Sequence, residues 1–387
     1  MTKRSHRIGV LGVLLTIALT VLSLYTPAGA LNVGEVDLKA YHSAFQLYAE
    51  GKNPYDPVLL QSAQQAYGNF SEDFQFVWNP PWIFPLLSPV LSLPWESAVP
   101  IWMVFNISAL FLVSFLGWKL ESGSKISWLS LLLFTALFFP AWETIAFGQL
   151  SLFIALATVG ALLAWKHHHD FLCGALFFVP SIKPHVIYLL VIILALIIIR
   201  ERRFKILLGF VGAAAIFSAL LLAHDPEIFW KWVYLQGTPL DLKSVTLVTP
   251  AREMLLRITG TAPSWPLYAI PALALGTVLI FKSAVTTSKG FFRSLTLLLP
   301  LSFLTAPYGW SFDQSILLIA QAMLIARVYS TCKSKEFQIL FAVSLVSYEC
   351  LILICSFFLK VQHYFAWVPI GFIALHYWVE RKCVSKH

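Results

Sequence analysis

The chain of 387 residues is 58% hydrophobic and 12% charged, with a mean hydropathy of +0.76, whereas soluble chains are about 25% charged. These values exclude a soluble globular protein. The net charge of +8 does not indicate nucleic-acid binding, because the basic residues lie singly or in small groups between apolar runs. Backbone groups cannot stay unpaired in hydrocarbon, so apolar runs of about 20 residues predict an all-α polytopic membrane protein, whereas a β-barrel requires short alternating segments.

The first expected element is an apolar run from Ile8 to about Tyr25, which basic residues precede. The "AGA" at Ala28–Ala30 resembles a signal-peptidase site, so the run is either a signal peptide or an uncleaved first helix. We favour the uncleaved helix because the run is longer than a signal core of about 7 to 15 residues. Both readings place the next segment, 26–99, outside the cytoplasm.

The remaining apolar runs, with their proline and glycine breakers, predict further helices. We expect them near 100–119, 126–140, 145–165, 171–182, 184–199, 204–223, 266–282, 291–305, 314–327, 337–359 and 363–379. Several are shorter than a full span, which gives about 10 to 12 crossings in a single domain over 1–387. Prolines break the segment Pro80–Trp95 too often for an ordinary span, so we expect an interfacial or re-entrant segment there.

The charges predict which side of the membrane each loop occupies. With both termini in the cytoplasm, most of the 27 lysines and arginines fall on the cytoplasmic side, as the positive-inside rule requires. The long loops 26–99 and 224–265 and most acidic residues then fall outside. Loops of this length are usually functional, so we expect the working surface on the extracytoplasmic face of a bacterial plasma membrane.

The unusual polar residues collect at this outer end of the predicted bundle, where ionisable groups are functional candidates. Asp37 has two readings that do not exclude each other. As one of the preferred N-cap residues it would cap a helix from about Leu38 to Glu50. A carboxylate fixed at a helix start beside a polar cavity is also placed to accept a proton from a hydroxyl.

Lys183, in "SIKPH" at Ser181–His185, also has two readings. Pro184 breaks the helix and holds the ammonium near the outer membrane boundary, among freed backbone groups. The lysine could extend to lipid headgroups by snorkelling. It could also bind a lipid-linked phosphate, as lysine does elsewhere as a point charge.

Other features have simpler explanations. The cysteines show no Cys-x-x-Cys spacing, so we expect neither a disulfide framework nor a zinc site. The histidine run at 167–169 is read as a cytoplasmic loop rather than a metal site. Outer-face Trp and Tyr residues fit a membrane-interface belt better than sugar stacking, and Glu349 is expected to face the bundle interior with a hydrogen-bond partner.

A resemblance emerges from longer stretches taken in order. These are "DLKAYHSAFQLYAEGKNPYDP", "FVWNPPWIFPLLSPVLSLP", "FGQLSLFIALA", "GALFFVPSIKPHVIYLLVIIL" and "APYGWSFDQSILLI". Together they resemble glycosyltransferase family 87, of the GT-C superfamily, over about Gly34 to Ile319. That family takes sugar from polyprenyl-phosphate donors, and known members include mycobacterial mannosyltransferases acting on phosphatidylinositol mannosides.

The resemblance implies a GT-C bundle with long extracytoplasmic loops and site residues at matching positions. Asp37 matches the catalytic base, Lys183 the lysine-proline element and Asp313 the end of the late "PY-x-W" element. Many relatives carry a Ser-Pro pair and histidines in that late element, whereas this chain has Ala306-Pro307, so the acceptor cannot be carried over.

The residues themselves are compatible with this chemistry. A polyprenyl-phosphate sugar already has a good leaving group, so one base, Asp37, and positive charge from Lys183, helped by His185 or Arg252, suffice for inverting transfer without a cofactor or metal. The substrate-binding candidates are His42, Tyr55, Asn79, Gln149, Tyr308, Trp310 and Asp313. The expected partners are the donor, a glycolipid or glycan acceptor and membrane lipids, but no nucleic acid.

Two rivals remain at this stage. A transporter or lipid-linked-sugar flippase would also be a polytopic bundle, but such proteins place their site near the midplane between inverted repeats, and we find no matching half-repeat. A lipid-linked polymer ligase or polymerase would share the outer site and move a whole glycan. The sugar, mannose by resemblance, is not specified by any residue.

Overall fold

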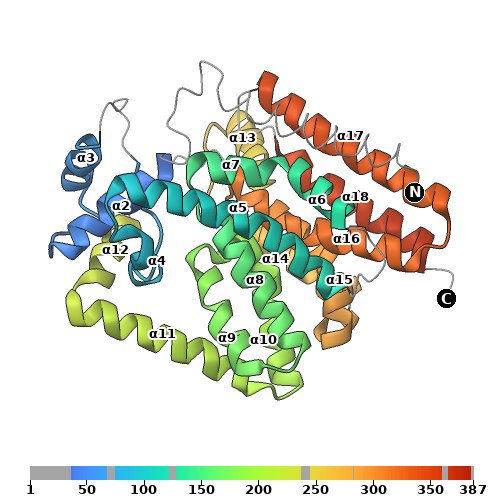
Figure 1. Cartoon of the computed structure of the whole chain (residues 1–387), viewed down its shortest axis with the longest axis horizontal. Helices are drawn as coiled ribbons and strands as arrows, with labels where there is room; N and C mark the ends of the chain where they lie inside the picture. Colours follow the sequence, from blue (N-terminus) through green and yellow to red (C-terminus); the bar gives the residue numbers. More distant parts are fainter. Residues whose placement is uncertain are drawn as a thin grey trace.

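The computed structural model describes residues 36–67, 75–121, 128–236, 245–281, 283–359 and 365–384. Over these ranges the chain is helical and contains no β-strand, which confirms the all-α prediction (Figure 1). The predicted first helix, 8–25, and the Ala28–Ala30 motif lie outside the described residues.

The helices follow one another through the described ranges. Those of the first half are α2 (Val36–Ala49), α3 (Pro57–Gln65), α4 (Ile83–Leu91), α5 (Trp95–Leu120), α6 (Trp128–Leu137), α7 (Phe139–Phe147), α8 (Ser151–Lys166), α9 (Asp170–Phe177) and α10 (Tyr188–Arg200). Those of the second half are α11 (Phe204–His224), α12 (Ile228–Gln236), α13 (Val248–Thr259), α14 (Pro266–Phe281), α15 (Ser288–Leu304), α16 (Leu317–Thr331), α17 (Lys335–Leu359) and α18 (Trp367–Val379). The short 3-10 helices are η1 (Val179–Ile182), η2 (Pro184–Ile187), η3 (Ser283–Thr286) and η4 (Ser311–Ile316), and a π-helical turn, η6 (Glu380–Val384), follows α18.

Among the described residues, four helical segments are long and apolar enough to cross a membrane: Trp95–Leu120, Phe204–His224, Ser311–Thr331 and Lys335–Ser356. Several shorter apolar helices accompany them, such as Ser151–Lys166. The protein therefore has the helices of an integral membrane protein, and the expected 10 to 12 crossings remain a prediction.

Two predicted helices begin or end elsewhere because of single residues. The run expected over 126–140 divides at Phe138, because Pro140 fits only the first turn of a new helix, α7. The run expected to begin at 145 begins at Ser151 instead, because Gly148 adopts a left-handed conformation (φ 71°) that ends α7. The proline-rich segment forms only the nine-residue α4.

Parts of the two predicted outer loops share a hydrophobic cluster with neighbouring residues of α5, α8 and α11. Leu38, Tyr55 and Phe84 of the first loop are buried in one cluster with Ile228 and Leu235 of α12. In Figure 1 α2, α3, α4 and α12 accordingly gather at one end of the molecule. The first long loop and α12 of the second are thus folded into one cap. Most of the other buried apolar residues, with Val245 of the second loop among them, form a larger cluster in the bundle.

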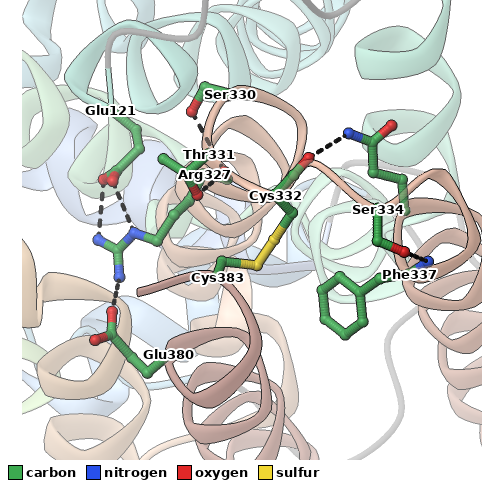
Figure 2. The surroundings of a disulfide bond; sticks show 10 residues. Glu121, Arg327, Ser330, Thr331, Cys332, Ser334, Phe337, Glu380 and Cys383 are labelled. Carbon is green, nitrogen blue, oxygen red and sulfur yellow. Dashed lines mark hydrogen bonds and ion pairs between the residues drawn. A yellow bond between two sulfur atoms is a disulfide. The ribbon is translucent and has the colours of Figure 1, made fainter. Parts of the chain in front are cut away.

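The expectation of no disulfide was wrong. Figure 2 shows Cys332, after α16, bonded to Cys383, in the turn after α18. The cysteines are 51 residues apart and meet only because α16 and α18 pack together, which sequence spacing does not reveal. Beside them the buried Arg327 guanidinium donates to both carboxylate oxygens of Glu121 (2.7 and 3.0 Å) and to Glu380 (2.8 Å).

Candidate active site

The candidate active site forms where four parts of the chain meet: the turn between α7 and α8, the break between η1 and η2, the first turn of α2, and η4. Gly148 turns the chain between α7 and α8, so that Gln149 follows at the turn. Lys183 has a non-helical backbone (φ −136°, ψ 65°) between η1 and η2, because the proline that follows disfavours a helical conformation. The first turn of α2 and the short η4 complete the site. Such breaks free polar side chains and backbone groups in a bundle that is otherwise continuous.

Lys183 is a buried cation whose partners are all on other elements. Its side chain is 10% exposed, and Nζ donates to Asp313 Oδ1 at 2.7 Å and to Gln149 Oε1 at 3.1 Å. Nζ also lies 5.0 Å from the centre of the Phe312 ring. An ammonium has three N–H donors, so one remains after these two hydrogen bonds. The side chain therefore turns into the protein, which does not fit the snorkelling reading.

Gln149 links the lysine to the first turn of α2. Its Oε1 accepts from Lys183 and from the Tyr41 hydroxyl (3.1 Å), and since an ammonium can only donate, the partners fix the orientation of the amide. The Gln149 side chain is also hydrogen-bonded to the Asp37 carboxylate. With Oε1 facing the two donors, Nε2 is the atom that donates to Asp37.

Asp37 is a partly buried carboxylate inside the first turn of α2, rather than before it as the capping reading required. Burial raises its pKa to about 6, the charge of Asp313 adds to the rise, and the Gln149 hydrogen bond and the Lys183 charge oppose it. A general base works best with a pKa near the operating pH. The site thus holds a carboxylate suited to accepting a proton near neutrality.

Asp313 is more enclosed than Asp37 and its oxygens are already engaged. The side chain is 2% exposed. Oδ1 accepts from Lys183 and from Ser151 Oγ (2.6 Å), and Oδ2 accepts from the Trp310 backbone N–H (3.2 Å). Its geometry is that of the counter-ion of Lys183, so Asp37 is the better placed of the two carboxylates to act as a base.

The His185 and Tyr308 rings stack beside this cluster, with 3.8 Å between their centroids. His185 Nε2 is buried and makes no hydrogen bond with any residue that the structure describes. An orphan ring nitrogen of this kind is uncommon in a folded interior and is available to a ligand. The Trp310 ring lies over that of Phe312, at 6.4 Å between centroids.

The comparison with known families decides what this arrangement belongs to. The sequence model of glycosyltransferase family 87 matches residues 76–368. The chain belongs to glycosyltransferase family 87. A search of curated proteins and a search of solved structures each return no match. Family membership and the apolar helices together make the protein a membrane glycosyltransferase.

The family 87 match differs in extent from the resemblance found in the sequence. It continues past Ile319 into α17 and the start of α18, where no motif was recognised. It begins after α2, so Asp37 lies outside it, whereas Gln149, Lys183 and Asp313 lie inside. The role of Asp37 therefore rests on its contacts in this family 87 chain.

Four predicted site residues lie apart from the cluster. His42 faces Tyr67 and the Leu93 carbonyl, Tyr55 donates to the Asn79 carbonyl at 3.2 Å, and Arg252 donates from Nε to the Pro263 carbonyl at 3.1 Å. The structure thus brings together Asp37, Gln149, Lys183, His185, Tyr308, Trp310 and Asp313, but not His42, Tyr55, Asn79 or Arg252.

The sequence reasoning missed three neighbours of this family 87 site. Tyr41 lies four residues after Asp37, on the same face of a helix, and that spacing is a usable signal. Ser151 stands inside the quoted "FGQLS" motif. Glu143 of α7 lies against Ser311, and burial raises its pKa to about 7, which no local pattern indicated.

Proposed function

We propose that this family 87 enzyme transfers a hexose, mannose by family resemblance, from a polyprenyl-phosphate-linked donor to a glycolipid or glycan acceptor, with inversion. The observation that carries the proposal is the contact chain Asp37–Gln149–Lys183. In this chain the Gln149 amide contacts both the Asp37 carboxylate, whose pKa is about 6, and the buried Lys183 ammonium. A proton acceptor therefore lies close to a positive charge that can bind phosphate.

The chemistry follows from these two groups. Asp37 takes the proton of the acceptor hydroxyl while the hydroxyl oxygen attacks the anomeric carbon of the donor sugar. The bond between that carbon and the phosphate oxygen breaks, and its electron pair leaves with the polyprenyl phosphate. Attack from the face opposite the phosphate inverts the anomeric centre through an oxocarbenium-like transition state.

The leaving phosphate gains negative charge, and this side of the site offers donors to it. Lys183 keeps one N–H beyond its two protein hydrogen bonds, and the unpartnered Nε2 of His185 lies in the same cluster. Prearranged donors of this kind stabilise developing charge without reorganising. Arg252, predicted as a further phosphate ligand, would have to leave the Pro263 carbonyl to take part.

We place the reaction on the extracytoplasmic face of a bacterial plasma membrane, with both termini in the cytoplasm. The support is the positive-inside charge pattern and the packing of the first long loop, which carries Asp37, against α12 of the second. A flippase or transporter is the alternative function, and it would need no proton acceptor at the anomeric carbon.

The test is sugar transfer from radiolabelled polyprenyl-phosphate-mannose and polyprenyl-phosphate-glucose in membranes that express wild type or Asp37→Asn. We expect transfer by wild type, which names the sugar, and at least about a hundredfold loss in the variant, as for a removed general base. Asp56→Asn is the matched control: Asp56 caps α3 in the same loop, and asparagine caps equally well. Full activity of Asp37→Asn at equal expression would refute the assignment of the base, and no transfer from either donor would favour the flippase.

A further inference from the structure

The face of α2 that turns away from Asp37 borders a separate cleft. His42 follows Asp37 by five residues, which at about 100° per residue places it roughly 140° around the helix. The cleft has a volume of about 850 Å³, within the usual range for small-ligand sites. Its walls come from α2, α3 and the turn before α5, and they include His42, Gln46, Glu50, Ala66, Tyr67 and Trp95.

The aromatic part of the cleft is held rigidly. His42 Nε2 donates to the Leu93 carbonyl at 2.9 Å, which leaves Nδ1 to accept from the Tyr67 hydroxyl at 2.7 Å. The Trp95 ring packs against both, with centroid distances of 5.4 Å to His42 and 5.1 Å to Tyr67. Because Tyr67 and Trp95 are only partly buried, they present fixed ring surfaces to the cleft.

The polar part of the cleft is rich in hydrogen-bond acceptors and poor in free positive charge. Glu50 and Glu96 are exposed. Burial raises the pKa of Tyr67, and the negative charges of Glu96 and Glu50 raise it further. Lys52 is paired with Glu50 at 2.7 Å, and burial lowers the pKa of His42, which keeps that ring neutral near pH 7. Lys39 does not line the cleft, although its ammonium lies 5.8 Å from the centre of the Trp95 ring. The lining side chains therefore carry a net negative charge, which disfavours a phosphate or another anion.

We propose that this cleft binds the non-reacting sugar residues of a saccharide acceptor. Hydroxyl groups of a neutral sugar donate to carboxylates in charge-assisted hydrogen bonds, and the apolar faces of sugar rings pack on fixed aromatic rings. An acyl chain would leave Glu50, Glu96 and Gln46 facing hydrocarbon, which is unfavourable. This inference rests on the proposed function, and it names the acceptor class that the site would select.

The position of the cleft sets the size of the acceptor. Gln46 is nine residues along α2 from Asp37, which is about 14 Å along the helix axis at 1.5 Å per residue and about 180° around it at 100° per residue. One hexose cannot reach both, so the bound part and the reacting hydroxyl belong to different sugar residues. Trp95 also begins α5, a candidate membrane span, so a lipid-anchored saccharide would meet the cleft at the membrane boundary.

The test compares acceptors of two lengths and one variant that fills the cleft. The acceptors are methyl glycosides carrying one or three mannose or glucose units. Ala66 is exposed and lines the cleft, so Ala66→Trp occupies it with little effect on folding. Val58→Trp is the matched control, because Val58 is 71% exposed at the other end of α3 and does not line the cleft. Glu96→Gln probes the carboxylate separately.

For wild type and Val58→Trp we expect the trisaccharide to have the lower KM. Ala66→Trp should raise the trisaccharide KM about tenfold or more, as for the loss of a central contact, and leave the monosaccharide KM unchanged. Glu96→Gln should raise it in the same direction. Equal KM values for the two lengths in wild type, or no change in Ala66→Trp, would overturn the proposal.

A second measurement separates this proposal from the proposed function. Saturation-transfer NMR detects binding of the methyl trisaccharides to Asp37→Asn protein in detergent, without any donor. Binding that Ala66→Trp abolishes and Val58→Trp keeps supports the cleft even if no donor is ever used. Transfer activity in wild type without trisaccharide binding leaves the enzyme assignment intact and removes the cleft from it.

Discussion

Replacing Gln149 by methionine tests the contact chain at its centre. Methionine has a similar length and shape but can neither accept from Lys183 and Tyr41 nor donate to Asp37. Lys183 keeps its ion pair with Asp313 at 2.7 Å, so the nearby positive charge stays in place. The substitution therefore removes chiefly the hydrogen bond that stabilises the ionised form of Asp37.

The size of the effect follows from that hydrogen bond. A hydrogen bond to a charged group contributes about 1.5 to 3 kcal/mol, and one pKa unit corresponds to about 1.4 kcal/mol. Since the bond to Gln149 lowers the pKa of Asp37, its loss raises that pKa from about 6 to about 7 or 8. Only ionised Asp37 accepts the proton, so at pH 6 the variant loses about 5- to 50-fold of the wild-type rate and recovers near pH 9.

The assay is kcat/KM for sugar transfer across pH 5 to 9, in which the acid limb reports the pKa of the free enzyme. Wild type should show a midpoint near pH 6, and Gln149→Met a midpoint about one to two units higher. Gln338→Met is the control, because Gln338 contacts the Cys332 carbonyl far along the chain. A variant that is slower at every pH with an unmoved midpoint would show that Gln149 does not act through Asp37.

Two further substitutions test charges elsewhere in the fold. Asp313→Asn leaves Lys183 without its counter-ion and removes a negative charge near Asp37. We expect the acid limb of kcat/KM to move below pH 6 and the donor KM to change. An unchanged pH profile would contradict the charge coupling between Asp313 and Asp37. Arg327→Met strands the carboxylate of Glu121 and leaves Glu380 paired with Arg293 alone. We expect a loss of up to about 3 to 5 kcal/mol of unfolding free energy, measured by thermal unfolding in detergent. An unchanged Tm would show that this ion-pair network is not stabilising.

The helices were largely predictable because their causes are local. Apolar runs and their breakers located α5, α10, α11 and α17 within a few residues. The break at Lys183 was expected from Pro184. The division at Phe138 was missed, since the single proline that causes it lay in a run that otherwise reads as continuous apolar helix.

Some members of the candidate site could be nominated from the sequence, but their geometry could not. Motifs nominated Asp37, Gln149, Lys183 and Asp313, yet Lys183 meets Gln149 across 34 residues and Asp313 across 130. Such contacts depend on how the helices pack, and no local pattern in the sequence encodes that packing. His42 was nominated as a substrate-binding residue, although α2 turns it and Asp37 toward different sides.

The paired state of Lys183 explains how one site could serve two opposing demands. An unpaired ammonium would be costly to bury before substrate binds, and Asp313 and Gln149 remove that cost while leaving one N–H for a ligand. A donor phosphate bound there brings a new negative charge close to Asp37, and a like charge raises the pKa of a carboxylate further. Donor binding would thus make Asp37 the stronger base at the moment when a proton must be taken from the acceptor. The acid limb of kcat, measured with bound donor, should therefore lie at higher pH than that of kcat/KM, and coinciding limbs would argue against a phosphate at Lys183.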